Sequence, residues 1–341
     1  MGCRHALCAL LLLLMPACAR AVEPANPHAN ARVKAILTYM TGLTKRTDQR
    51  VLSGQFTMCG AGATLPELQR AFDSTRKWPA LAGLDYCIGH KGIDYTDVNA
   101  CAMKWWDERG LVTISAHMDD PVRPDGGGLR DKPIDMSQLL TPGTDVYTRW
   151  MKELSTLADG LDALQHHGVV VFWRPFHEMN GSWFWWGGGD PVTFQKVWRQ
   201  MFDYFTTTRK LNNLIWVYSP NHGTRTVAYY AGDHYVDLVG LDAYTDDVDP
   251  QHIHGYDEVA ALPKPFGFTE FGPHGPSNPP GDYDYRRFIA GIRQYFPRAC
   301  FFMSWNARWS IGGNNNGKEL MNDPWIVSRG DLPARLFTVR P

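Results

Sequence analysis

The segment Val169-Val-Val-Phe-Trp-Arg-Pro-Phe-His-Glu178 joins an uninterrupted apolar run to a cluster of polar and aromatic residues. An apolar run without alternation predicts a strand over residues 169–173 that is buried on both of its faces. Similar short apolar runs recur along the chain. The predicted strands cover residues 51–56, 78–86, 111–117, 169–173, 214–218, 236–241, 265–269 and 300–305.

Longer amphipathic stretches separate these runs and predict helices over residues 96–109, 145–167 and 192–209. The second stretch has leucines at helical spacing and is followed by Gly168, a favoured helix C-cap residue. The third follows Asp190-Pro191, a capping residue and then proline at the first helical position. Eight strands alternating with helices predict an α/β fold, a (β/α)₈ TIM barrel. A doubly wound sheet shares the alternation, but eight similar units favour a closed barrel. We found no linker, so residues 22–341 are expected to form a single domain.

Active sites of such barrels lie at the C-terminal ends of the strands. In this sequence the predicted strand ends carry a strongly polar and aromatic set, and the opposite ends carry nothing comparable. The set comprises Gln55, Asp85, His117, Arg174, His177, Glu178, Asn221, Asp242, Tyr244, Glu270 and Trp305. We therefore expect the active site at this end of the barrel.

The composition narrows the class of partner. The 341 residues have a formal net charge of −1, which argues against a nucleic-acid or anionic-membrane partner and favours a neutral substrate. The chain has 13 Trp, which could fill the core or form flat platforms on which sugar rings stack. The glycine triplets 126–128 and 187–189 do not join a strand to a helix as phosphate-binding loops do. No cofactor is therefore expected.

The N-terminus has the pattern of an export signal. Arg4 precedes an apolar run over residues 6–15, and Ala19-Arg20-Ala21 forms a small-residue cleavage site. We predict a signal peptide over residues 1–21, a mature chain that begins near Val22, and a secreted protein. A lipoprotein anchored through Cys18 is the alternative, but the residues before Cys18 match that pattern poorly.

Four cysteines follow the predicted signal peptide, namely Cys59, Cys87, Cys101 and Cys300. An even number in an oxidising compartment predicts one or two disulfides. Three of them lie close together in the chain, so we expect a bridge among these three. The spacings do not suggest a zinc site.

Two glutamates follow predicted strands on opposite sides of the barrel. Glu178 comes after the fourth strand and Glu270 after the seventh. Hydrolysis of a glycosidic bond requires two carboxyl groups, one to protonate the leaving oxygen and one to attack or to activate water. Facing positions suit the separation of about 5–5.5 Å found in retaining enzymes. A salt bridge with Arg174 is the structural alternative for either glutamate.

The longer segment Trp173-Arg-Pro-Phe-His-Glu-Met-Asn-Gly-Ser-Trp-Phe-Trp-Trp-Gly187 resembles the acid/base signature of glycoside hydrolase family 26. Shorter matches are Asp242-Ala-Tyr244, Thr269-Glu270-Phe271 and Ser304-Trp305-Asn306. The resemblance extends over essentially the whole predicted mature chain. Members of this family are (β/α)₈ barrels and mostly β-mannanases.

The resemblance implies a general acid/base at Glu178 and a nucleophile at Glu270. It also implies substrate-binding residues at His117, His177, Trp183, Tyr244 and Trp305. The implied reaction is endo-hydrolysis of β-1,4-mannosidic bonds in mannan, glucomannan and galactomannan by double displacement. No metal is implied, and a monomer is expected.

The two proposed roles require different environments. A general acid needs a raised pKa, which the aromatic wall at residues 183–186 is expected to provide by desolvating Glu178. The nucleophile must stay ionised, so Glu270 is expected to accept hydrogen bonds from Tyr244, His177 or Arg174.

Several alternatives are compatible with the sequence. The same fold and mechanism could act on mixed-linkage β-glucan or β-1,3-xylan, or release mannobiose from chain ends. Trp185-Trp186 after Phe184 resembles the mannanase form of the signature and favours mannan. A carbohydrate-binding pseudoenzyme is disfavoured because both glutamates are present. His117, Asp119, His177 and Asp242 could serve a metal-dependent hydrolase, but the His-x-His signature of such barrels is missing after the first strand.

Overall fold

The computed structural model of the chain describes residues 23–87, 93–124, 127–131, 134–273 and 281–339. The predicted signal peptide, residues 1–21, lies outside the described residues. The strands are β1 (Val51–Leu52), β2 (Gly54–Phe56), β3 (Leu81–Asp85), β4 (Leu111–Ser115), β5 (Val171–Arg174), β6 (Leu214–Tyr218), β7 (Leu238–Tyr244), β8 (Phe266–Gly272), β9 (Ala299–Ser304) and β10 (Ile326–Val327).

The named strands form a closed parallel barrel. Strands β2 to β9 each pair with the next, and β9 pairs in turn with β1 and β2. Strands β1 and β2 together make up the first predicted strand, interrupted at Ser53. The short strand β10 pairs with β1 outside this ring. The predicted single-domain (β/α)₈ barrel is confirmed.

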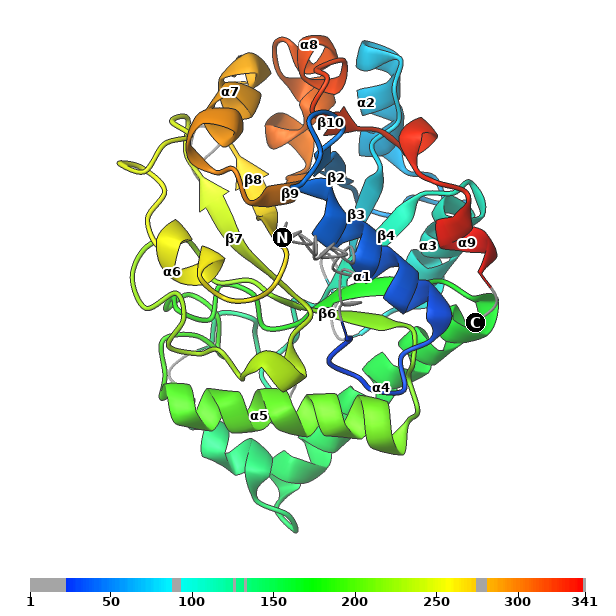
Figure 1. Cartoon of the computed structure of the whole chain (residues 1–341). Coiled ribbons are helices and arrows are strands. Elements are labelled where there is room, and N and C mark those ends of the chain that lie inside the picture. The colour runs from blue at the N-terminus through cyan, green and yellow to red at the C-terminus, as the bar shows by residue number, and fades with distance from the viewer. Residues whose placement is uncertain (1–22, 88–92, 125–126, 132–133, 274–280, 340–341) are drawn as a thin grey trace, which may run out of the picture.

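Helices surround the barrel, as Figure 1 shows. They are α1 (Ala31–Leu43), α2 (Pro66–Thr75), α3 (Thr96–Asp107), α4 (Asp145–His167), α5 (Pro191–Asp203), α6 (Tyr256–Ala260), α7 (Tyr285–Tyr295), α8 (Gly317–Met321) and α9 (Arg335–Thr338). The connection from β6 to β7 has only the short 3₁₀ helix Asp233–Tyr235, so the alternation is less regular than predicted.

Two of the predicted helix-capping residues, Gly168 and Asp190, are confirmed. Helix α4 has the predicted bounds and ends at Gly168, whose φ of 88° is the left-handed conformation that glycine tolerates. Asp190 caps α5 by accepting a hydrogen bond from the Thr193 backbone N–H at 2.8 Å. The predicted end of α5 at residue 209 was too late, because residues 204–208 form a π-helical turn.

Helix α1 covers the N-terminal end of the barrel. The Asn30 backbone N–H donates to the Asn212 carbonyl, and the Arg32 guanidinium donates to the Gly168 carbonyl. Asn212 and Gly168 both precede strands, so α1 lies across the start of the barrel (Figure 1). Helix α1 therefore leaves the opposite, C-terminal end of the barrel uncovered, where the active site was predicted.

Strand β8 contains a bulge that decides where Glu270 points. Phe268 and Phe271 both pack on Phe288 of α7, although residues three apart in a regular strand face opposite sides. The pairing register with β7 shifts at the same place. The extra residue leaves Thr269 and Glu270 directed into the barrel, as bulges near active sites often do.

The predicted C-terminal ends of two strands were wrong. Strands β7 and β8 extend to Tyr244 and Gly272, three residues beyond the predicted ends. Asp242, Tyr244 and Glu270 therefore lie within strands and not in loops, where backbone pairing holds them more firmly.

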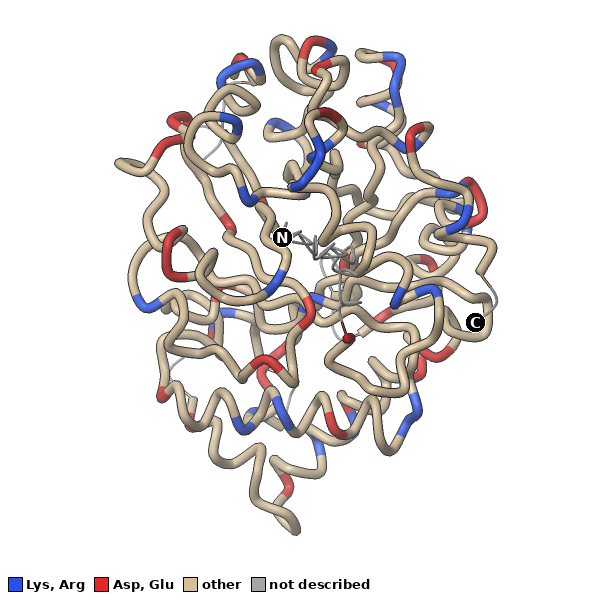
Figure 2. The backbone as a smooth tube through the Cα atoms, in the orientation of Figure 1, with Lys and Arg blue, Asp and Glu red and all other residues tan. Residues whose placement is uncertain are grey.

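Most of the tryptophans fill the core. Trp105, Trp150, Trp173, Trp185, Trp186, Trp198 and Trp216 are fully buried. The platform interpretation applies to a smaller group described below. On the surface, Lys and Arg are interspersed with Asp and Glu along the described chain (Figure 2). None of the helices in the described ranges combines the length and apolar character of a membrane span.

The predicted bridge among the first three cysteines is confirmed, because Cys59 is bonded to Cys101. Cys87 and Cys300 are free and buried. The disulfide joins the segment after β2 to α3 across a sequence separation of 42 residues.

We predict that replacing both Cys59 and Cys101 with Ser lowers the free energy of unfolding by about 4 kcal/mol, the chain-entropy value for a loop of this length. Urea unfolding of both proteins, with and without reductant, measures the difference. Reductant should destabilise the parent protein and leave the double variant unchanged. Equal stability of the two oxidised proteins would contradict the prediction.

Candidate active site

A cleft of about 480 Å³ opens at the C-terminal end of the barrel. All seven residues predicted for the site line this cleft. Among the described residues, the lining consists of His117, Arg130, His177, Glu178, Trp183, Phe184, Asn221, His222, Tyr244, Glu270, Trp305 and Trp309.

Glu178 lies in a strained turn directly after β5. Its φ is 56° and that of Phe176 is 52°, values that cost about 1 kcal/mol or more for a residue with a side chain. Packing offsets this strain, because the Phe176 ring is buried against Trp185 and Trp186. The turn directs Glu178 into the cleft, where Oε2 accepts a hydrogen bond from Trp183 Nε1 at 2.5 Å.

Burial raises the pKa of Glu178 well above its usual value, and the charges of Asp242 and Glu270 raise it further. The Trp183 hydrogen bond opposes this shift because it stabilises the anion. The predicted aromatic wall is only partly correct. Trp183 and Phe184 line the cleft, whereas Trp185 and Trp186 are buried and donate to the Met118 and His177 carbonyls.

Glu270 has the opposite environment and is only 3% exposed. One carboxylate oxygen accepts a hydrogen bond from Arg174 Nη2 at 2.5 Å, and the other accepts from the Tyr244 hydroxyl at 2.7 Å. Two donors, one of them permanently charged, stabilise the anion. The salt bridge with Arg174 that was the structural alternative exists, and it serves to hold Glu270 in the cleft.

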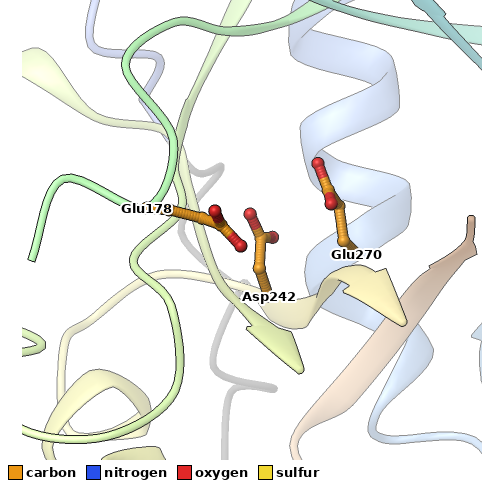
Figure 3. Close-up of side chains that lie close together, drawn as sticks. All are labelled: Glu178, Asp242 and Glu270. Atoms are coloured by element: carbon orange, nitrogen blue, oxygen red, sulfur yellow. The ribbon is translucent and has the colours of Figure 1, made fainter. Parts of the chain in front are cut away.

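Asp242 lies between the two glutamates in the view of Figure 3. Oxygen atoms of Glu178, Asp242 and Glu270 lie within 4.8 Å of one another. Arg174 Nη1 donates to Asp242 at 3.0 Å, so one guanidinium joins Asp242 and Glu270. Burial raises the pKa of Asp242 to about 7, against the opposing effect of Arg174.

Three converging carboxylates could hold a cation on spacing alone. Here Arg174 is 3% exposed and already supplies positive charge to two of them. Protons on Glu178 and Asp242, which their raised pKa values favour, reduce the remaining negative charge. The group is therefore balanced by its own guanidinium and protons.

The separation of the two glutamates decides which glycosidase chemistry is possible. Their nearest oxygens lie within 4.8 Å, well below the roughly 6.5–9.5 Å that leaves room for water in inverting enzymes. This geometry suits direct attack by one carboxylate and proton donation by the other.

A chain of polar contacts runs behind the glutamates. Asp85 accepts from His117 Nδ1 at 2.7 Å, and His117 Nε2 lies 3.0 Å from His177 Nε2. His177 Nε2 is also 4.0 Å from a Glu270 oxygen. Burial opposes ionisation of Asp85, but its interaction with His117 and its hydrogen bonds from Ser115 and the Cys87 backbone N–H lower its pKa to about 2. This carboxylate is therefore ionised and orients His117. His177 has a pKa well below its usual value because of burial, and is neutral.

The sequence analysis assigned no catalytic or substrate-binding role to some residues in or beside the cleft. Asp242 was named as a strand-end residue, and its spacing of two from Tyr244 places both on one face of β7. Trp309 comes from a short 3₁₀ helix after β9, and Arg130 comes from the loop after β4. No periodic pattern marks these two positions.

A buried carboxyl group with a raised pKa, opposite a second one bonded to an arginine and a tyrosine at the mouth of a parallel barrel, defines the active site of a retaining glycoside hydrolase. The model of glycosyl hydrolase family 26 matches residues 25–331. The chain belongs to this family.

Known relatives agree with this assignment. A mannan endo-1,4-β-mannosidase of Bacillus subtilis strain 168 is 37% identical, with 96% of this chain and 93% of that protein covered. Mannan endo-1,4-β-mannosidase A and B of Caldalkalibacillus mannanilyticus is 38% identical over 90% of this chain, which spans 62% of that longer protein.

Solved structures are similar throughout. The Bacillus subtilis mannanase Man26 is 36% identical and superposes with a TM-score of 0.83, covering 91% of this chain and 96% of that one. A β-mannanase from a symbiotic protist of the termite Reticulitermes speratus, complexed with gluco-manno-oligosaccharide, is 26% identical with a TM-score of 0.73 over 91% of this chain and 97% of that one.

We predict that Trp183→Phe moves the alkaline limb of the kcat/KM profile upward by about one pH unit. The substitution removes the hydrogen bond that stabilises the Glu178 anion, and a bond to a charged group contributes about 1.5 kcal/mol. A pH–rate profile on a soluble mannan oligosaccharide measures the shift. Trp305→Phe is the control, because it alters the cleft without removing a bond to Glu178. An unchanged or lowered limb in Trp183→Phe would oppose the assignment.

Proposed function

We propose that this protein is an endo-acting mannan 1,4-β-mannosidase in which Glu178 is the general acid/base and Glu270 the nucleophile. The observation that carries the proposal is the pair of carboxyl groups within 4.8 Å, one with its pKa raised by burial and one bonded to Arg174 and Tyr244. Family membership and the relatives' activity supply the substrate class.

In the first step Glu270 attacks the anomeric carbon of the mannosyl unit. The bond between that carbon and the leaving oxygen breaks, and Glu178 transfers its proton to this oxygen. The product is a covalent ester between Glu270 and the sugar, with the released chain carrying the new hydroxyl. The hydrogen bonds from Tyr244 and Arg174 keep Glu270 oriented before the attack.

In the second step the roles of the two carboxyl groups change. Glu270 no longer carries a negative charge once it is esterified, so the repulsion that kept Glu178 protonated is weaker. Glu178 can then take a proton from water, which attacks the anomeric carbon and restores the Glu270 carboxylate. Two inversions give net retention of configuration.

The cleft supplies contacts for a neutral sugar. Trp183, Trp305 and Trp309 offer indole faces, and Trp305 is held by stacking on Phe56 with ring centroids 4.0 Å apart. Hydroxyl groups of the sugar find polar partners in His117 and His177. We assign these residues, with Tyr244, to substrate binding.

Azide rescue separates the two roles. With an aryl β-mannobioside, Glu270→Ala should lose at least a thousandfold in kcat, and azide entering the vacated space should yield an α-azide by one inversion. Glu178→Ala should still form the ester from an activated aryl leaving group, and azide attacking that ester should yield a β-azide by two inversions. NMR of the products distinguishes the anomers.

Glu319→Ala, in helix α8, is the matched control and should behave as the parent protein. Interchanged azide products would reverse the two assignments. Unaltered turnover in either glutamate variant would refute the double-displacement proposal for this site.

We also propose that the protein is exported and acts as a monomer. Residues 1–21 have the signal pattern, the Cys59–Cys101 bridge suits an oxidising compartment, and one chain supplies the whole described cleft. Expression of the full chain in a secreting bacterial host should yield extracellular protein whose mass corresponds to a start near Val22, and light scattering should give the mass of one chain. Intracellular protein that keeps residues 1–21 would contradict export.

A further inference from the structure

The turn that carries Glu178 needs support from outside itself. Positive φ values at Phe176 and Glu178 make the turn strained, and such conformations persist only where surrounding contacts hold them. One backbone contact is the bond from the Glu178 N–H to the Ser219 carbonyl at 2.7 Å. A second contact comes from a side chain two residues further on.

Asn180 connects this turn to the loop after β6 through three side-chain hydrogen bonds. Its Oδ1 accepts from the Asn221 backbone N–H at 2.8 Å. Its Nδ2 donates to the Asn221 carbonyl at 2.8 Å and to the Thr224 carbonyl at 3.0 Å. A single amide thus fixes three backbone groups of residues 221–224.

The same loop is bonded to the strand that carries the other acidic groups. The His222 backbone N–H donates to the Asp242 carbonyl at 2.9 Å, and the Asp242 N–H donates to the Pro220 carbonyl at 3.0 Å. Asn180 therefore completes a continuous path of hydrogen bonds from the Glu178 turn to β7. Asp242 and Tyr244 of β7 in turn contact the groups around Glu270.

We propose that Asn180 is a positioning residue that holds the Glu178 carboxyl group at the correct distance and angle for proton transfer to the leaving oxygen. This proposal rests on the proposed function of Glu178. Asn180 is only partly buried, so water can satisfy the groups that its removal exposes. Its loss should therefore displace the turn and not unfold the barrel.

The test uses leaving groups that need protonation to different degrees. For a series of aryl β-mannobiosides, dinitrophenolate leaves without a proton, whereas unsubstituted phenol needs the acid. Asn180→Ala should keep kcat/KM for the dinitrophenyl substrate within about threefold of the parent value. It should lose roughly 10–100-fold for the phenyl substrate, part of the 10²–10⁴-fold that a general acid contributes. A purely structural defect would lower both values equally.

Asn213→Ala is the matched control. The Asn213 amide also bridges two backbone carbonyls, those of Leu161 and Val169, but at the N-terminal end of the barrel. Its thermal stability should fall while its ratio of phenyl to dinitrophenyl kcat/KM stays at the parent value. If Asn180→Ala also keeps the parent ratio, the positioning role is refuted.

Two further variants distinguish a failure of the Glu178 assignment from a failure of the role proposed for Asn180. Glu178→Ala should show the steepest dependence on the leaving group; if it shows none, the proposed function fails and not only the role of Asn180. Asn180→Asp keeps the acceptor for the Asn221 N–H and loses both donors, so its loss on the phenyl substrate should be intermediate. This variant also provides the measurement if Asn180→Ala does not fold, and a parent-like ratio in it would overturn the proposal.

Discussion

The shared guanidinium of Arg174 is the contact on which the chemistry of the cleft depends. At an effective dielectric constant of about 20, two unit charges 4.8 Å apart repel by roughly 3 kcal/mol, so three ionised carboxylates could not coexist here. Arg174 bonds to Asp242 and Glu270 but not to Glu178. Asp242 and Glu270 are thus paired with the guanidinium, whereas Glu178 is buried beside both carboxyl groups without this contact, and burial together with their charges raises its pKa. Arg174 and Glu178 come from the end of β5, Asp242 from β7 and Glu270 from β8, so the group is assembled only when these three strands lie together in the barrel.

Two backbone irregularities bring the glutamates to face each other. In a regular strand Glu270 would face the same side as Phe268, outside the barrel, but the bulge in β8 turns it inward. The strained turn after β5 places Glu178 at the mouth of the barrel. Both irregularities are anchored by aromatic rings on the outer side, Phe288 for the bulge and Trp186 for the turn. Much of the aromatic content of the chain therefore supports geometry near the site and does not contact the substrate.

The sequence predicted what depends on composition and period. Apolar runs located the strands, Gly168 and Asp190 marked helix ends, and strand-end polarity located the mouth of the barrel. The bulge in β8 was not predicted because the polar pair Thr269-Glu270 is equally typical of a strand end, and the strand was therefore expected to end at Thr269. The bond from Arg174 to Glu270 was among the expected contacts, but the sharing of Arg174 with Asp242 depends on contacts between β5 and β7, which no local pattern encodes. Trp185 and Trp186 were ambiguous because a buried indole and a platform indole look alike in sequence.

The placement of helix α1 has a practical consequence for handling this protein. Arg32 of α1 bonds to the Val339 carbonyl near the other end of the described chain, and Ala25 bonds to the Asp237 carboxylate beside the start of β7. Both ends of the described chain are therefore attached to the end of the barrel that faces away from the cleft (Figure 1). A tag or tether joined at either end would leave the mouth facing outward, so the protein can be fixed to a solid support with its cleft open to long polymers.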